Sequence, residues 1–226
     1  MSYPRVIAHR CGGVLARENS LAGLEAAARL GCHAVEFDVM LTRDNVPILM
    51  HDETLDRTTA CRGRVADLTL AQIHVCDPSV PTLAAAIEAC RRLALWTNIE
   101  LKPARGHEEE TGDVVGAWLA THWNGNGVIS SFSENSALAG RRHLPGAAFA
   151  LLHAALPEDW RAQAERLGAT AVHLAAENVD EATARQLNAT RMPWACWTVN
   201  DRGAAERLFA LGCAAIFTDR PDLWPS

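Results

Sequence analysis

Residues 34–51 read AVEFDVMLTRDNVPILMH, and this stretch sets the expectations for the rest of the chain. Its first part, Ala34–Leu41, is a mostly apolar run with the length and composition of a buried strand. A turn is expected at Asp44-Asn45, because both residue types favour turns, and a short return run follows at Pro47–His51. The stretch therefore predicts one long strand with a hairpin at its end.

Outward from this stretch, strand-like runs alternate with helical ones. Further strands are expected at Arg5–His9, Leu95–Leu101, Gly127–Phe132, Ala147–Leu152, Ala171–Ala175, Pro193–Val199 and Ala214–Thr218. Helical periodicity is found at Ser20–Leu30, Leu83–Leu93, His107–Trp123, Glu134–Arg142, Pro157–Leu167, Glu181–Leu187 and Gly203–Leu211. About eight strand–helix units favour an α/β fold of the (β/α)₈ TIM barrel type over an open doubly wound sheet.

The chain of 226 residues shows no linker, low-complexity segment or repeat that would divide it. We therefore expect a single barrel domain over residues 1–226. Residues 52–80 lie between the return run and the next helical stretch, so they are expected to form a small insertion after the second strand.

The composition argues against several function classes. A formal net charge of −6 gives no electrostatic reason to expect nucleic acid or an anionic membrane surface as a partner. There is no signal-peptide pattern, and no run approaches the roughly 18 apolar residues of a membrane span, so we expect a cytoplasmic protein. The seven cysteines include no CxxC pair, and we expect free thiols packed as small hydrophobic groups.

Carboxylates interrupt two of the apolar runs. Side chains alternate faces along a strand, so Glu36 shares a face with Asp38, and Glu100 shares one with Lys102. On adjacent barrel strands these groups would meet at the mouth, where three carboxylates repel one another unless a cation lies among them. An all-oxygen cluster suits Mg²⁺ or Ca²⁺ rather than zinc, and Mn²⁺ is also compatible. The alternative, ordinary exposed charges at strand ends, fits poorly with the apolar runs around them.

Two histidines, His9 and His51, end strand-like runs near these carboxylates. Imidazole titrates near neutral pH, so the pair suits general acid and base catalysis. Arg10 offers a forked set of donors that matches phosphate, and Lys102 offers a point charge. A metal, two histidines and two cations together indicate a site for an anionic phosphodiester.

Short motifs in a fixed order run from residue 7 to residue 222. They are Ala8-His9-Arg10, Glu18-Asn19-Ser20, Glu36-Phe37-Asp38-Val39, His51-Asp52, Leu55-Asp56-Arg57-Thr58-Thr59, Pro81-Thr82-Leu83, Ile99-Glu100-Leu101-Lys102, Trp197-Thr198-Val199-Asn200 and Phe217-Thr218-Asp219-Arg220-Pro221. In this order they resemble the glycerophosphodiester phosphodiesterase family, whose members have a (β/α)₈ barrel with a small insertion after the second strand.

The resemblance implies a metal-dependent enzyme of glycerol and lipid metabolism that hydrolyses glycerophosphodiesters, a small-molecule substrate, to an alcohol and glycerol 3-phosphate. The implied acid/base pair is His9 and His51. The implied ligands of one divalent ion are Glu36, Asp38 and Glu100. The implied substrate-binding residues are Arg10 and Lys102 at the phosphate and Trp197 in the pocket wall.

The chain departs from the family pattern at Cys11, where the family has glycine after the His-Arg pair. Because glycine tolerates backbone angles that cysteine does not, Cys11 is expected to narrow the pocket or alter the first loop. The other departure is Arg17-Glu18-Asn19-Ser20 in place of Pro-Glu-Asn-Thr, and Asn19 matches a position that supports the site.

Three polar positions are expected to serve the fold. His173 is interpreted as a satisfied structural histidine, Asp219 as the brace of a loop, and Arg57-Thr58-Thr59 as part of a folded turn. Two other functions stay open: a related phospholipase D-like barrel enzyme acting on lysolipids, and a non-catalytic barrel that binds phosphorylated metabolites. The sequence leaves the oligomeric state, the head-group alcohol and the nucleophile open.

Overall fold

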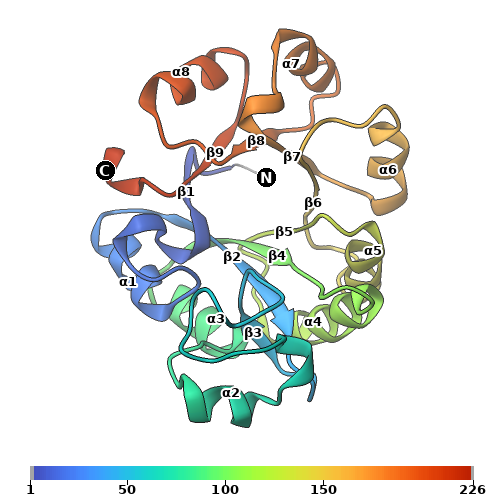
Figure 1. Ribbon diagram of the computed structural model, residues 1–226. Coiled ribbons are helices and arrows are strands. Elements are labelled where there is room, and N and C mark those ends of the chain that lie inside the picture. The colour runs from blue at the N-terminus through green and yellow to red at the C-terminus, as the bar shows by residue number, and fades with distance from the viewer. Residues whose placement is uncertain (1–2, 225–226) are drawn as a thin grey trace.

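Eight strand-like runs become the parallel strands of a closed barrel in the computed structural model, which describes residues 3–224 (Figure 1). These strands are β1 (Val6–Ala8), β2 (Ala34–Leu41), β4 (Trp96–Leu101), β5 (Gly127–Ser131), β6 (Phe149–His153), β7 (Ala171–Ala175), β8 (Trp194–Trp197) and β9 (Ala215–Thr218). They pair in the order β1-β9-β8-β7-β6-β5-β4-β2, and the pairing of Ala8 with Val35 joins β1 to β2. The predicted (β/α)₈ barrel is confirmed.

The longer helices cover the outside of the ring (Figure 1). They are α1 (Leu21–Arg29), α3 (Leu83–Arg92), α4 (Glu108–His122), α5 (Glu134–His143), α6 (Trp160–Leu167), α7 (Glu181–Asn188) and α8 (Arg202–Ala210). Thr82 caps α3 by accepting a hydrogen bond from the backbone N–H of Ala85 at 3.2 Å. Gly168 ends α6 with a φ of 63°, a left-handed conformation that favours glycine. Among the described helices, none is long and apolar enough to cross a membrane.

Two hydrophobic clusters hold the barrel. The larger packs strand residues such as Phe37 of β2 against helix residues such as Leu83 of α3. The smaller draws a side chain from every barrel strand, including Ile7, Trp96 and Ala195, which places it inside the ring. Most of its members precede the polar residues of the same strands, so it fills the amino-terminal end of the interior. The carboxyl-terminal end is then the place for a cavity.

The hairpin expected within residues 34–51 is present. β3 (Pro47–Leu49) pairs antiparallel with the end of β2, with Val39 opposite Leu49. The turn between them contains Asn45 at a φ of 58°, a left-handed conformation that asparagine tolerates better than most residues. The hairpin extends beyond the ring, and its second strand returns so that His51 lies at the rim.

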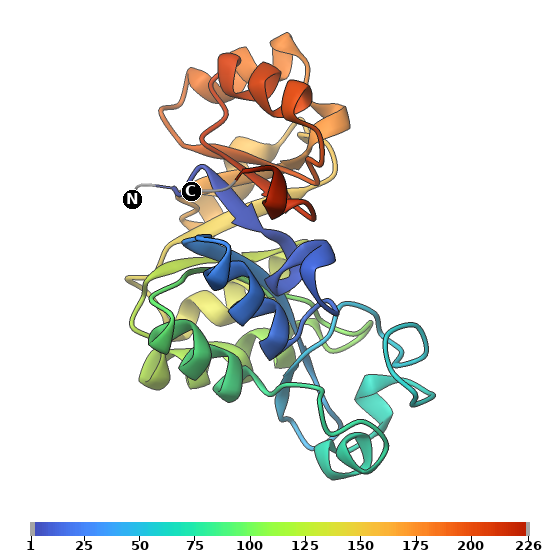
Figure 2. The ribbon, with the colours of Figure 1, turned by 90° about the vertical axis from the view of Figure 1, so that its left-hand side faces the viewer.

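Residues 52–80, here called the excursion, extend beyond the barrel beside this hairpin (Figure 2). They pack a small hydrophobic cluster of their own, in which Leu55 and Ile73 lie against Ile48 of β3. The excursion contains a helix that the periodicity did not predict, α2 (Leu70–Cys76). Its sequence signal is a capping box, in which Thr69 and Gln72 satisfy each other's backbone N–H groups.

The expectation of free thiols throughout is wrong for one pair. Cys61 and Cys76 form a disulfide within the excursion, across a Cα–Cα distance of 5.6 Å and 15 residues of sequence. The last residue of α2 is Cys76, so the unpredicted helix is what brings the two thiols together. The remaining cysteines are free, as predicted: Cys11, Cys32, Cys90, Cys196 and Cys213.

Candidate active site

A cavity of about 290 Å³ opens at the carboxyl ends of the barrel strands. It is lined by every residue that the sequence placed in the site: His9, Arg10, Glu36, Asp38, His51, Glu100, Lys102 and Trp197. They come from the ends of β1, β2, β3, β4 and β8, segments that are distant in sequence but meet at one rim of the closed ring.

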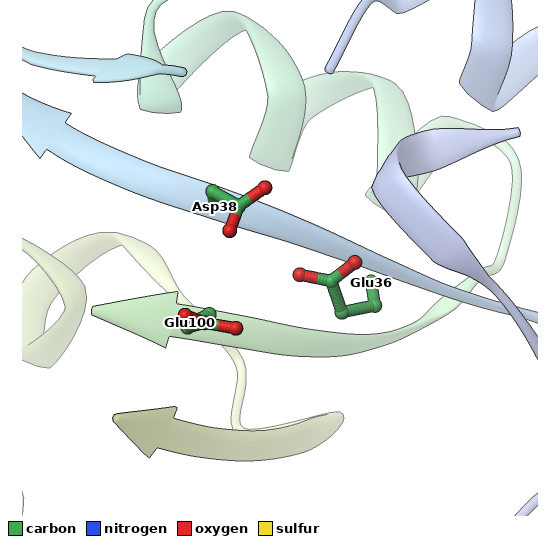
Figure 3. Close-up of side chains that lie close together, drawn as sticks. All are labelled: Glu36, Asp38 and Glu100. Atoms are coloured by element: carbon green, nitrogen blue, oxygen red, sulfur yellow. The ribbon is translucent and has the colours of Figure 1, made fainter. Parts of the chain in front are cut away.

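The three predicted carboxylates converge inside this cavity (Figure 3). Asp38 and Glu100 lie side by side in the β2–β4 register, and one oxygen from each of the three side chains lies within 4.8 Å of the others. Burial is the largest cause that raises the pKa of Glu36 well above its usual range and the pKa of Glu100 to about 7, and repulsion from Asp38 adds to both. Three buried carboxylates so close together need a compensating positive charge.

The cluster fits a hard divalent cation. Oε1 of Glu36 is buried and has no hydrogen-bond partner among residues 3–224, as expected of an oxygen that serves as a metal ligand. Asn19 orients a second carboxylate of the cluster, because its side-chain amide donates to Oδ2 of Asp38 at 2.8 Å and accepts from the Asp38 backbone N–H at 3.1 Å. The support expected of Asn19 therefore acts on Asp38.

His9 is held between two acids. Its Nδ1 lies 2.7 Å from Oδ1 of Asp219, and its Nε2 lies 3.8 Å from Oε2 of Glu36. The hydrogen bond with His9 lowers the pKa of Asp219, whose second oxygen accepts from the Asn200 amide at 3.0 Å. Asp219 thus orients the imidazole as well as bracing a loop. The sequence feature that could have indicated this role is the position of Asp219 at the end of the last strand, because closure of the barrel places β9 beside β1.

His51 has the same arrangement on the other side of the cavity. Its Nδ1 lies 2.6 Å from Oδ1 of Asp52, so Nε2 is the nitrogen left for proton transfer. Burial lowers the pKa of His51, while Asp38 and the hydrogen bond with Asp52 favour the charged ring. Each predicted catalytic histidine is therefore fixed by a carboxylate on its Nδ1, as in other acid/base sites.

Asp52 belongs to a chain of ion pairs that runs from the excursion to Glu18 and Arg10. Arg57 donates to Asp52 from Nε at 2.6 Å and to the two oxygens of Glu18 at 2.7 and 2.8 Å. Glu18 accepts in turn from Nη1 of Arg10 at 3.2 Å. Arg57 does not line the main cavity. It connects the side chain beside His51 with the side chain that holds Arg10.

The two predicted phosphate-binding cations face the carboxylate cluster. Nζ of Lys102 lies 3.1 Å from Glu100 and 3.5 Å from Asp38. Burial opposes charge on Lys102, but the two carboxylates outweigh it and raise its pKa. Nε of Arg10 is buried without a hydrogen-bond partner among residues 3–224 and lies 3.8 Å from Oδ2 of Asp38.

Cys11 does not narrow the cavity. It is buried in the larger hydrophobic cluster, with its Cβ near Gly23 of α1, and it is not a lining residue. The first loop keeps left-handed backbone angles without glycine, with φ at 48° for Arg10 and 76° for Cys11. This bend points the Arg10 backbone N–H at Glu36, to which it donates at 2.8 Å.

Apolar and uncharged polar side chains line the rest of the cavity. Trp197 lies edge-to-face with Phe132, with ring centroids 5.5 Å apart, so the predicted pocket aromatic is in the wall. Asn98, Ser130 and His173 also line the cavity, and neither Asn98 nor Ser130 was singled out in the sequence. Asn98 pairs with Glu36, and Ser130 pairs with Glu100, in the strand register. Asn98 precedes Glu100 by two residues, and the strand period alone puts it on the cavity face.

Known proteins resemble the chain over nearly its whole length. A model of the glycerophosphoryl diester phosphodiesterase family matches residues 9–223. A glycerophosphodiester phosphodiesterase from Caldanaerobacter subterraneus is 30% identical, across 96% of this chain and 94% of that protein.

Solved structures agree with this match. An Oleispira antarctica phosphodiesterase, in complex with the product sn-glycerol-3-phosphate, is 32% identical with a TM-score of 0.93, across 97% of this chain and 94% of that one. A glycerophosphodiester phosphodiesterase from Thermotoga maritima, 22% identical with a TM-score of 0.81 across 99% of this chain and 98% of that one, shares the fold.

Proposed function

The chain belongs to the glycerophosphoryl diester phosphodiesterase family, and from this premise we propose that it hydrolyses glycerophosphodiesters to glycerol 3-phosphate and an alcohol. It is an enzyme of the phosphodiesterase class. The observation that carries the proposal is the pairing of two carboxylate-oriented histidines with a buried carboxylate cluster in one cavity.

In this proposal Glu36, Asp38 and Glu100 hold one divalent cation, Mg²⁺, Ca²⁺ or Mn²⁺. A bound cation of this kind supplies charge neutralisation to phosphate oxygens. Arg10 and Lys102 hold the non-bridging oxygens of the phosphodiester from the protein side, since both cations line the cavity and face the cluster.

His9 and His51 divide the proton transfers. One imidazole accepts the proton of the attacking hydroxyl at Nε2, and the other donates a proton to the leaving alkoxide. Asp219 and Asp52 keep each ring oriented with Nδ1 occupied. The attacking hydroxyl belongs either to water or to the substrate, and in the second case a cyclic phosphate forms first. Trp197 and Phe132 form the wall beside the reacting group.

A hydrolysis panel tests this proposal. Purified protein is incubated with glycerophosphocholine, glycerophosphoethanolamine and a micellar lysolipid, with chelator and after adding back each of the three metals. We expect release of glycerol 3-phosphate from the soluble diesters, loss of release with chelator, and recovery with a divalent ion. Glu100→Gln should lower metal affinity, whereas Glu109→Gln, at the exposed start of α4, should not.

Two results would contradict the proposal. Turnover that is insensitive to chelator would remove the role of the carboxylate cluster as a metal site. Faster cleavage of the lysolipid than of the soluble diesters would favour the phospholipase-like alternative instead.

A further inference from the structure

The excursion contacts the loop between β1 and α1 at two neighbouring residues. Glu18 accepts hydrogen bonds from the two terminal nitrogens of Arg57 at 2.7 and 2.8 Å. Arg17, the residue before Glu18, donates from Nη1 to Asp77 at 2.7 Å. Arg57 and Asp77 come from opposite ends of the excursion, so two separate parts of it hold adjacent positions of one loop beside the cavity.

The disulfide joins these two parts of the excursion to each other. Cys61 closely follows Arg57 in the sequence, and Cys76 is the residue directly before Asp77. The bond therefore closes a ring of contacts that runs from Arg57 through Glu18 and its neighbour to Asp77 and back through the two cysteines. While the bond is intact, the segment that carries Arg57 cannot move away from the end of α2.

Short hydrogen bonds connect the position of Cys61 to that of Arg57. The N–H of Cys61 donates to Oγ1 of Thr59 at 2.9 Å, and this hydroxyl donates to the Leu55 carbonyl at 2.7 Å. The N–H of Leu55 donates in turn to the Gly63 carbonyl at 3.0 Å. Arg57 lies inside this tight turn, so the anchoring of Cys61 also anchors the backbone of Arg57.

The side chain of Arg57 needs such an anchor because it is half exposed. Its side chain is 49% exposed, and exposed ion pairs are weak because ordering two long side chains costs conformational entropy. A backbone that is already held in place reduces this cost. The contacts of Arg57 with Glu18 and Asp52 should therefore be stronger with the disulfide than without it.

The two sulfurs differ in access from solution. Cys76 is an exposed residue at the end of α2, whereas Cys61 is 4% exposed and packs in the hydrophobic cluster of the excursion. Exposed disulfides are the ones that exchange readily with thiols in solution, and they are often regulatory. A thiolate from solution can therefore attack at Cys76, with Cys61 as the leaving group.

We propose that the disulfide between Cys61 and Cys76 is a redox switch that sets the activity of the site through Arg57, an inference that rests on the proposed function and adds regulation to it. With the bond intact, Arg57 is held against Glu18 and Asp52, which contact a cavity arginine and a catalytic histidine. With the bond reduced, the turn that carries Arg57 separates from α2 and both ion pairs weaken.

The switching step is a thiol–disulfide exchange with a dithiol reductant. A thiolate of the reductant attacks the sulfur of Cys76, the S–S bond breaks, and Cys61 leaves as a thiolate that takes up a proton. The second thiol of the reductant then attacks the mixed disulfide and releases Cys76, which also takes up a proton. The reductant ends as a cyclic disulfide, and two electrons and two protons have passed to the protein. A small disulfide oxidant reverses the exchange.

Activity measured in both redox states tests the switch. The oxidised protein is treated with dithiothreitol, and alkylation followed by mass spectrometry shows whether Cys61 and Cys76 become free. We expect kcat/KM for glycerophosphocholine to fall about 3- to 10-fold on reduction, which is less than the loss expected when an orienting side chain is removed. The activity should recover on reoxidation with oxidised glutathione.

Amide hydrogen exchange gives a second readout that does not depend on turnover. On reduction, exchange should accelerate in residues 16–20, where the Asn19 N–H donates to the Arg10 carbonyl at 2.9 Å, and should stay unchanged in β5 to β8. Acceleration confined to the excursion and this loop distinguishes a local opening from a general loss of stability.

Three variants separate the switch from unfolding. Arg57→Ala should have low activity in both states and respond less than about twofold to reductant, because the effect passes through this side chain. Cys32→Ser removes a free, partly buried thiol and should keep the full response. Cys61→Ser combined with Cys76→Ser should match the reduced wild-type protein. If this double variant folds poorly, the reversible titration of the wild-type protein still decides the matter.

Full activity in protein that alkylation shows to be reduced at both cysteines would overturn the inference. So would an equal loss of activity on reduction in Arg57→Ala and in the wild-type protein, or free thiols at both positions after oxidation. If neither redox state hydrolyses a glycerophosphodiester, the proposed function fails. Exchange in residues 16–20 then decides whether the disulfide controls the loop, and unchanged rates on reduction would refute that control.

Discussion

The two halves of the cavity mouth differ in chemistry. The half formed by β1, β2, β3 and β4 carries the two histidines, the carboxylate cluster and the two cations Arg10 and Lys102. The half formed by β5 to β8 carries Ser130, Phe132, Leu152, His173 and Trp197, which are neutral at physiological pH. The difference divides one ring into a charged half and a neutral half.

The halves are also supported differently. On the charged half, groups outside the barrel strands orient the two histidines. Asp219 follows β9 and contacts His9, whereas Asp52 follows β3, contacts His51 and pairs with Arg57 of the excursion. On the neutral half, the strands themselves hold the lining residues. The charged half should therefore be sensitive to changes at a distance, and the neutral half should respond only to changes in its own core.

The largest effect is expected at His51. His51→Ala removes one member of the acid/base pair and should lower kcat for a glycerophosphodiester about 10²- to 10⁴-fold with little change in KM, measured by release of glycerol 3-phosphate. His143→Ala on α5, where the side chain is paired with Asp113 at the surface, is the control and should be near normal. Near-normal turnover in His51→Ala would contradict the assignment of His51 to the acid/base pair.

The second-largest effect is expected from removal of the disulfide. Replacing Cys61 and Cys76 with serine opens a loop of 15 residues and should lower the free energy of unfolding by about 3 kcal/mol, measured by urea denaturation. Amide hydrogen exchange should accelerate in residues 52–80 and stay unchanged in β5 to β8. Equal acceleration in both regions would mean that the two halves are not supported independently. Adding reductant to the double variant should have no further effect.

Substitution of Arg57 should change the activity less than substitution of His51. Arg57→Ala releases Asp52 and Glu18 together, so it should lower kcat about 10- to 100-fold, comparable to losses of groups that orient catalytic ligands. Arg64→Ala is a matched control from the same excursion, because Arg64 pairs with Glu53 and not with Asp52. If the two variants lose the same activity, the link from Arg57 to His51 is not functional.

The smallest effect concerns His173 and the stability of the neutral half. The folded-state pKa of about 3 lies below the ordinary value of 6.5, so the unfolded chain binds a proton here more readily than the folded one. Stability is therefore lost as pH falls below about 6.5, and lowering pH from 7 to 5.5 should cost about 1 kcal/mol through this residue. His173→Gln should remove that part of the pH dependence of urea unfolding. An unchanged slope would show that His173 is not held neutral.

Most of the barrel and the predicted site could be read from the sequence because both depend on local periodicity. The period of two placed Glu36 with Asp38 and Glu100 with Lys102 on the cavity face, and closure of the ring brought these faces together. The division into domains, the metal and the roles of the site residues stay predictions.

The parts that could not be predicted depend on contacts between distant segments. The disulfide needs α2, whose seven residues are too few for a clear helical period, so only the capping box at Thr69 marks it. The link from Arg57 to Asp52 needs the path of the excursion, which has no repeating pattern. Asn98 could have been identified by parity, but its unsatisfied carbonyl is visible only in three dimensions.

The bond between His9 and Asp219 joins residues 210 positions apart, across the seam where β9 meets β1. During synthesis His9 leaves the ribosome long before the carboxylate that orients it has been made. The carboxylate cluster, which spans only residues 36 to 100, can assemble much earlier. We therefore expect docking of the last strand to be the step that orients His9, because closing so long a loop costs more entropy than closing the segment from residue 36 to residue 100. In a nascent barrel, we expect the carboxylates of residues 36 to 100 to come together first. His9 would be oriented only when β9 pairs with β1.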